Sequence, residues 1–208
     1  MYARLQCTGG PLPQIDGVET KQQHVVEVIS GHPGFAGLYM LDQIGIGRRV
    51  LLTLWTTRDE ASGASARTRG ELGPRPFELE VDELYEVIDD WSGPAAAEES
   101  AGAASFMQFE TPMSQARFDA GQRGAKERIQ PAVAKVPGAI RTLTLWDAER
   151  RALVVFAFAT SMDALDAAGR TANSTELLPG EDPALLAGPT RFDVCTVVES
   201  VPSVAITR

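Results

Sequence analysis

The segment HPGFAGLYML, residues 32–41, has a counterpart 104 residues later in VPGAIRTLTL, residues 136–145. In both copies a Pro-Gly pair marks a turn, and the apolar or alternating residues that follow predict a strand. A displacement of 104 residues is too long for the unit of a solenoid. The chain is therefore expected to contain the same structural unit twice.

The segments around the two copies predict the same elements in the same order. They are an alternating strand (2–7 and 105–110), a helix (15–30 and 114–135), the strand after Pro-Gly, an apolar strand (50–57 and 153–160), a short helix (58–66 and 161–169) and a last strand (84–91 and 191–199). Thr57 and Glu60 match Thr160 and Asp163 at a displacement of 103, which places a one-residue slip in the intervening hairpin turn.

The order β-α-β-β-α-β is that of the ferredoxin-like unit, an antiparallel sheet with both helices on one face. Residues 50–57 and 153–160 are apolar at almost every position, whereas a sheet with one wet face would alternate. Both faces should then be buried, and helices cover only one. We expect an α+β protein of two tandem ferredoxin-like repeats whose antiparallel sheets pack face to face as an intramolecular barrel.

The division of the chain follows from this repeat. We expect a first repeat at residues 1–91, a linker of small residues at 92–104 and a second repeat at 105–208. Two segments rich in Pro and Gly, residues 69–83 and 174–190, interrupt the pattern before the last strands and predict loops. The second is a candidate lid over the barrel.

Composition and charge exclude several classes of partner. The chain has 208 residues, a formal net charge of −9 and 44% apolar residues, so it should form a core and repel nucleic acid. No apolar stretch approaches the ~20 residues that span a bilayer, and MYARLQCTGG, residues 1–10, lacks the basic-then-apolar pattern of a signal peptide. We expect a cytoplasmic protein, monomer or homodimer, that binds neither nucleic acid nor membrane and has a small molecule as its potential ligand.

The segment LLTLWTTRDEA, residues 51–61, resembles the strand, tryptophan and acidic helix start common in the dimeric α+β barrel superfamily. That group includes the antibiotic-biosynthesis-monooxygenase-like proteins, and this chain resembles a tandem fusion of two such units. The resemblance covers nearly the whole chain as topology. It implies a barrel that holds a small aromatic or polyketide-like molecule.

Alternation along the strands divides the side chains between two faces. Leu51, Thr53 and Trp55 share one face, and the aliphatic set Val50, Leu52 and Leu54 shares the other. We assign the aliphatic set to the helices, so that Trp55 looks into the barrel with its counterparts Val154, Phe156 and Phe158. Candidate ligand-binding residues are Trp55, Arg4, Gln6, Tyr39, Gln108, Glu110 and Phe158.

Each of these candidates has an ordinary structural alternative. Trp55 in an apolar strand is also typical of a packed core. Arg4 and Glu110 are equally consistent with a salt bridge or with the exposed end of a strand. No nucleophile motif or nucleotide-binding glycine loop is present, so no catalytic residue is assigned.

Histidine is scarce, and this bears on cofactors. His24 and His32 are the two histidines of the chain, with no spacing typical of a zinc or iron site, so no metal and no cofactor is expected. Haem degraders of the superfamily have a ligating histidine in the second helix, where this chain has Gly63–Arg67. The cofactor-independent quinone-forming relatives use Trp, Asn and Tyr, of which Trp55 alone has a counterpart here.

Three functions remain open from the sequence. The first is a monooxygenase-like protein, or a related isomerase-like enzyme, that binds a small aromatic or polyketide-like molecule in the barrel lumen and acts on it without a cofactor. The second is a non-catalytic small-molecule-binding protein of the same fold. The third is a structural protein with solidly packed sheets, and a cavity of ~300 Å³ or more would favour the first two.

Overall fold

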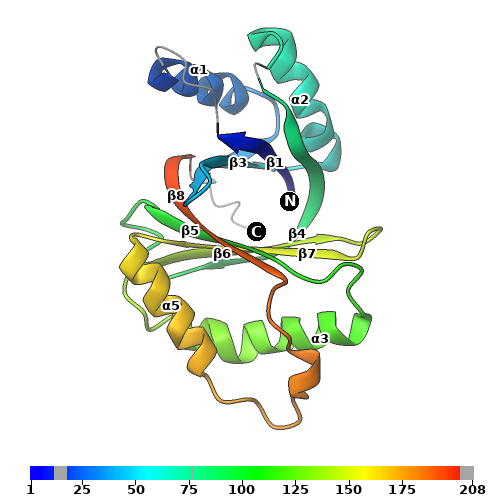
Figure 1. Cartoon of the computed structure of the whole chain (residues 1–208), viewed down its shortest axis with the longest axis vertical. Coiled ribbons are helices and arrows are strands. Elements are labelled where there is room, and N and C mark those ends of the chain that lie inside the picture. The colour runs from blue at the N-terminus through cyan, green and yellow to red at the C-terminus, as the bar shows by residue number, and fades with distance from the viewer. Residues whose placement is uncertain (12–17, 76, 202–208) are drawn as a thin grey trace. The chain divides into compact units, whose positions relative to one another are not determined.

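The computed structural model of the chain describes residues 1–11, 18–75 and 77–201 (Figure 1). The predicted start of the first helix at Ile15 lies outside these residues. The first half contains β1 (Tyr2–Pro11), α1 (Val18–Ser30), β2 (Phe35–Gln43), β3 (Arg48–Trp55), α2 (Arg58–Leu72) and β4 (Leu79–Ser92). Its order is the predicted β-α-β-β-α-β.

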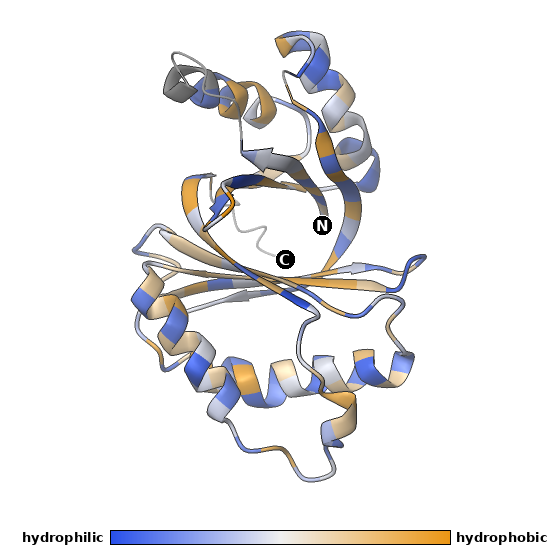
Figure 2. Ribbon diagram, in the orientation of Figure 1, coloured by the Kyte–Doolittle hydropathy of each residue, from blue (hydrophilic) through white to orange (hydrophobic). Residues whose placement is uncertain are grey.

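The second half follows the same plan with a longer first helix. It contains β5 (Ala103–Gln108), α3 (Gln115–Gly124), the π-helical turn η1 (Ala125–Ile129), α4 (Gln130–Val133), β6 (Ala139–Asp147), β7 (Ala152–Ala159), α5 (Met162–Ser174), the 3-10 turn η2 (Pro183–Leu185) and β8 (Arg191–Val201). Figure 2 shows hydrophobic and hydrophilic residues side by side on the helices, as expected where one face packs on a sheet.

The strands are hydrogen-bonded in the order β1-β3-β2-β8-β5-β7-β6-β4, which closes on itself as an antiparallel barrel. The predicted α+β fold class is confirmed. Two compact units divide the chain, one made of Met1–Val87 with Val197–Arg208 and the other of Ile88–Thr196. The domain boundaries at residues 91 and 105 were predicted from the sequence repeat, and they stay a prediction.

The spacing between equivalent positions is constant from the second strand of each half to the start of the helix that follows the third strand. From Phe35 to Ala139, where β2 and β6 start, the displacement is 104, and each strand has a register shift beside its first residue. The N-caps of α2 and α5, Thr57 and Ser161, are also 104 apart. The predicted one-residue slip is therefore wrong, and the counterpart of Trp55 is Ala159 rather than Phe158.

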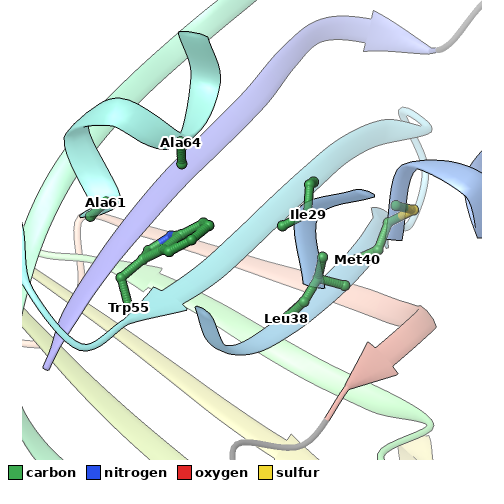
Figure 3. Close-up of a cluster of buried hydrophobic side chains, with 6 residues drawn as sticks. All are labelled: Ile29, Leu38, Met40, Trp55, Ala61 and Ala64. Carbon is green, nitrogen blue, oxygen red and sulfur yellow. The ribbon is translucent and has the colours of Figure 1, made fainter. Parts of the chain in front are cut away.

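The assignment of faces in the first unit was wrong as well. Trp55 packs against Ile29 of α1 and against Ala61 and Ala64 of α2, so its face of β3 lies under the helices (Figure 3). Leu52 and Leu54, on the opposite face, are also 0% exposed. Because both faces are buried, aliphatic content does not distinguish them. The small side chains of α2 accommodate the bulk of the indole beneath that helix.

In the second unit the predicted faces agree with the structure. Ala157 and Ala159 of β7 pack with Leu165 of α5. Phe156 and Phe158 therefore lie on the face away from α5, where the Phe156 ring stacks on Phe106 at 4.8 Å and on Phe158 at 6.1 Å between centroids. This aromatic stack forms the core of that face.

The Pro-Gly turns are present in both halves, and the first is tied to the start of α2. Gly34 has φ +73° and Gly138 has φ +82°, a region that favours glycine. A Cβ at Gly34 would lie 2.0 Å from the carboxylate of Glu60. That carboxylate caps α2 by accepting from the backbone N–H of Thr57 at 3.1 Å, in a capping box with the Thr57 hydroxyl.

The predicted loops are shorter or placed differently than expected. Because α2 continues to Leu72 and β4 begins at Leu79, most of the first segment belongs to these two elements and not to a loop. The second does not act as a lid but lies along the first helix of its own unit, where Arg128 pairs with the buried Glu181 at 3.2 Å.

Small residues between β4 and β5 serve close backbone contacts. A Cβ at Gly93 would lie 2.3 Å from the carbonyl oxygen of Ala139, and one at Gly102 would lie 2.4 Å from that of Thr160. The N–H of Gly93 donates to Ile140 O at 2.7 Å. Part of the small-residue composition that suggested a linker is thus explained by packing.

Candidate functional site

A cavity of about 440 Å³ lies wholly within the first unit, between helices α1 and α2 and the sheet. Its size falls within the ~300–1,000 Å³ typical of small-molecule sites. The described residues that line it are Arg4, Gln6, Thr8, Gln22, His24, Val25, Ile29, Met40, Arg49, Leu51, Thr53, Trp55, Ala64, Ser65, Thr68, Arg69, Leu72, Gly73, Pro74, Arg75, Phe77 and Leu79. We call this cavity the helix–sheet pocket.

Register places the strand residues of the pocket side by side. Arg4 lies opposite Thr53 across β1 and β3, and Gln6 lies opposite Leu51. Met40 lies opposite Leu51 on the other side of β3. Alternation in all three strands thus directs polar side chains of β1, Met40 of β2, and Leu51 and Thr53 of β3 to the same face. The sheet side of the pocket is therefore apolar with a polar edge.

Trp55 borders the pocket from a fully buried position. Its side chain is 0% exposed, and the indole Nε1 donates to Thr53 Oγ1 at 2.9 Å. Phe35 meets the ring edge to face at 5.8 Å, and the Arg67 guanidinium lies 5.9 Å from its centroid. Trp55 is therefore a packed core residue that also forms part of the pocket wall. The two interpretations of Trp55, core residue and pocket residue, are both compatible with the structure.

His32 lies against Trp55, just after the end of α1. It is 7% exposed, stacks on Trp55 with ring centroids 6.3 Å apart, and bonds through Nε2 to Glu71 Oε1 at 3.0 Å. This contact ties the end of α1 to α2. It holds the two helices together next to the tryptophan.

Arg4 and Asp82 form the best-connected polar pair of the pocket. Arg4 donates to Asp82 through Nε at 2.7 Å and Nη2 at 2.9 Å, a bidentate geometry, and through Nη1 to the carbonyl of Ala61 at 2.9 Å. Burial raises the pKa of Asp82, but hydrogen bonds from Arg4 and Gln6 and the charges of Arg4 and Arg75 outweigh it and hold that pKa below its ordinary value. Asp82 is therefore ionised at neutral pH.

Ser65 of α2 joins two further polar side chains. Its Oγ accepts from Gln6 Nε2 at 2.8 Å and from Arg75 Nη2 at 2.8 Å. Burial lowers the pKa of Arg75, since a guanidinium loses hydration there, although the charge of Asp82 acts in the opposite direction. Arg75 stays charged, because an arginine pKa starts far above neutral pH. The pocket thus has a polar end built from β1, α2 and the following loop.

The predicted site residues fall into two groups. Arg4, Gln6 and Trp55 come together in the helix–sheet pocket. Tyr39 is buried opposite Leu52 in β2, on the other face of the same sheet. Gln108, Glu110 and Phe158 belong to the second unit, where Glu110 forms an ion pair with Arg117. Ligand binding by any of the seven stays a prediction.

Sequence reasoning missed the residues of α2 and of the loop behind it. Ser65, Arg69 and Arg75 line the pocket, and Phe77 adds an aromatic wall. Ser65 fell in the predicted short helix at residues 58–66, which was not considered for the site, and residues 69–83 were interpreted as a loop outside the pattern. The available signal was its charge, because three arginines at positions 67, 69 and 75 stand out in a chain of net charge −9.

The residues present do not fit a haem. The α2 segment after Trp55 presents Ala64 and Ser65 to the pocket, and neither is a haem ligand. The lining histidine, His24, is 64% exposed and lies beside Glu27 at 3.9 Å. In the described part of the chain, no three His, Cys, Asp or Glu side chains are grouped so that they could hold a metal ion.

Comparison with known proteins identifies the fold. No family model and no curated protein matches the sequence. An anthrone oxidase-like protein matches in structure with a TM-score of 0.60 and 14% identity, over 96% of this chain and 92% of that chain. The chain has the dimeric α+β barrel fold.

Two further structures with this fold are similar over the whole length. A ferredoxin-fold protein from Listeria monocytogenes, related to antibiotic biosynthesis monooxygenases, matches with a TM-score of 0.52 and 11% identity over 95% of both chains. A monooxygenase-like protein from Listeria innocua matches with a TM-score of 0.53 and 12% identity, again over 95% of both chains. The suspected dimeric α+β barrel resemblance is confirmed for the fold.

No helix within residues 1–11, 18–75 and 77–201 is long and apolar enough to cross a membrane.

Proposed function

We propose that this protein binds a small aromatic or polyketide-like molecule in the helix–sheet pocket and oxidises it with O2 without a cofactor. The observation that carries the proposal is the pocket itself, a cavity of about 440 Å³ with an apolar wall and a few polar groups at one end. The predicted location in the barrel lumen is replaced by this pocket, because Trp55, Arg4 and Gln6 all face it.

The chemistry suits a substrate that forms a stabilised anion. A phenol or an anthrone that loses a proton to solvent water becomes an electron-rich phenolate or enolate, which O2 can oxidise directly. Arg75 is a fixed cation at the polar end, where it would favour that anion. Anthrone and O2 then give anthraquinone and water, with no external electron donor. The similarity in fold to an anthrone oxidase-like protein supports the choice of this test substrate.

The test is O2 uptake with anthrone, followed with the absorbance of the quinone product. We expect a rate above that of the spontaneous reaction, abolished in Thr68→Trp, because Thr68 lines the pocket and an indole there would fill it. The control is Ala66→Trp, which adds the same ring to an exposed position of α2 outside the pocket. A rate equal to the protein-free background, or equal rates in the two variants, would contradict oxidation in this pocket.

A second function, binding without turnover, is supported by the ionisable groups of the pocket. The described ionisable side chains that line it are arginines and His24. Asp82, the carboxylate bonded to this network, has a pKa below its ordinary value and so is a weak proton acceptor. Saturable binding of an aromatic ligand, blocked by Thr68→Trp and without O2 uptake, would favour this function.

A further inference from the structure

The charges around the helix–sheet pocket are unbalanced. Among its described lining residues are four arginines and no aspartate or glutamate. Two of these arginines form ion pairs with carboxylates that do not line the pocket. Arg4 pairs with Asp82 at 2.7 Å, and Arg49 pairs with Asp42 at 2.5 Å. In a chain of net charge −9, the pocket thus presents an excess of positive charge.

Arg75 is a partly buried arginine of the pocket with no carboxylate in direct contact to balance its charge. It is half-buried, and its one hydrogen bond among the described residues goes to Ser65 Oγ. No described carboxylate forms an ion pair with it, although Asp82 acts on it from a longer distance. A guanidinium has five N–H donors, so four of them are left for other acceptors.

Ser65 adds a donor at the same place. A serine hydroxyl has two acceptor lone pairs and one O–H. Gln6 and Arg75 both donate to Ser65 Oγ, so both acceptor positions are occupied. The remaining O–H is then available to donate to a ligand, since Ser65 lines the pocket.

We propose that the ligand of the helix–sheet pocket carries a carboxylate, bound by the Arg75 guanidinium and the Ser65 hydroxyl. One guanidinium and one hydroxyl match the two oxygens and the single negative charge of a carboxylate. The apolar wall holds the aromatic part of the same molecule. This inference rests on the proposed small-molecule function and names the class of ligand.

The test compares two fluorescent probes with the same ring system, 9-anthracenecarboxylate and the neutral 9-anthracenemethanol. A hydrogen bond to a charged group is strong enough that the wild-type protein should bind the acid at least about 10-fold more tightly at pH 7 and low salt. Arg75→Gln should bind the two probes within about 2-fold of each other. Ser65→Ala should lower the preference about 3-fold or more.

Control variants remove the same groups outside the pocket. Ser62→Ala and Arg58→Gln change exposed positions of α2 that do not line it, and both should keep the wild-type preference. Circular dichroism establishes that each variant is folded, and Ser65→Ala decides the question where Arg75→Gln does not fold.

The outcomes separate this inference from the proposed function. Equal wild-type affinity for the two probes, or an unchanged preference in both Arg75→Gln and Ser65→Ala, would overturn carboxylate recognition and leave the pocket as a neutral aromatic site. Failure of both probes to bind the wild-type protein would overturn the binding proposal together with this inference.

Discussion

Replacing Trp55 with phenylalanine tests the position of the indole under α1 and α2. The side chain is 0% exposed, and its Nε1 donates to Thr53 Oγ1 at 2.9 Å. Loss of the hydrogen bond costs about 1 kcal/mol. The smaller ring costs about 1–2 kcal/mol more, a fraction of the ~3–5 kcal/mol for truncating a buried Trp to Ala. We expect the free energy of unfolding to fall by about 2–3 kcal/mol.

Calorimetry measures this loss, and the control is a second tryptophan. A loss of 1 kcal/mol lowers the Tm of a chain of this size by about 2–4 °C, so Trp55→Phe should lower it by roughly 4–12 °C. Trp146→Phe should lower it less, because Trp146 is half-buried and its described ring contact is with Phe118 at 4.4 Å.

The same variant reports on the pocket wall. An aromatic contact contributes about 0.5–1.5 kcal/mol, so binding of 9-anthracenecarboxylate should weaken about 2- to 10-fold. A stability loss below about 1 kcal/mol together with unchanged binding would refute the reasoning, because the indole would then be neither packed in the core nor part of the wall.

Two other predictions concern acid stability and the turn before β2. Because the pKa of Asp82 is lowered in the folded state, its ionised form stabilises the fold above its unfolded pKa of about 4, and this contribution is lost as the pH falls through the folded pKa. Unfolding with urea should therefore show a stability difference between wild type and Asp82→Asn that is largest near neutral pH and shrinks below about pH 4; a difference that stays constant down to pH 2 would contradict the assignment. Gly34→Ala should cost about 2–3 kcal/mol from its positive φ and the displaced Glu60 cap, against about 1–2 kcal/mol for Gly45→Ala, which has φ +93° with no atom within 4 Å of the added Cβ. Equal losses of stability in thermal melts of the two variants would show that the capping position of the Glu60 carboxylate does not depend on glycine at position 34.

Much of the fold was predictable because its signals are local. The Pro-Gly pairs need glycine at Gly34 and Gly138, and both have positive φ. The apolar strands required burial on both faces, which led to a closed antiparallel barrel. Element order and class follow from such signals even where the ends of elements do not.

The location of the site depended on a feature that alternation does not reveal. Alternation correctly separated Trp55 from Leu52 and Leu54, but both sets are buried, so polarity could not show which set lies under the helices. The deciding feature is the small Ala61 and Ala64 face of α2, which leaves room for the indole. Arg75 was missed because its position depends on how the loop after α2 returns to β4.

The most direct test of the account is a crystal structure of the protein with 9-anthracenecarboxylate. We expect the ring system to lie between α1, α2 and the sheet of the first unit, beside Met40, Leu51 and Phe77, with its carboxylate on Arg75 and Ser65. A probe bound elsewhere, with this pocket filled by rearranged side chains, would contradict the central claim that the helix–sheet pocket is the functional site.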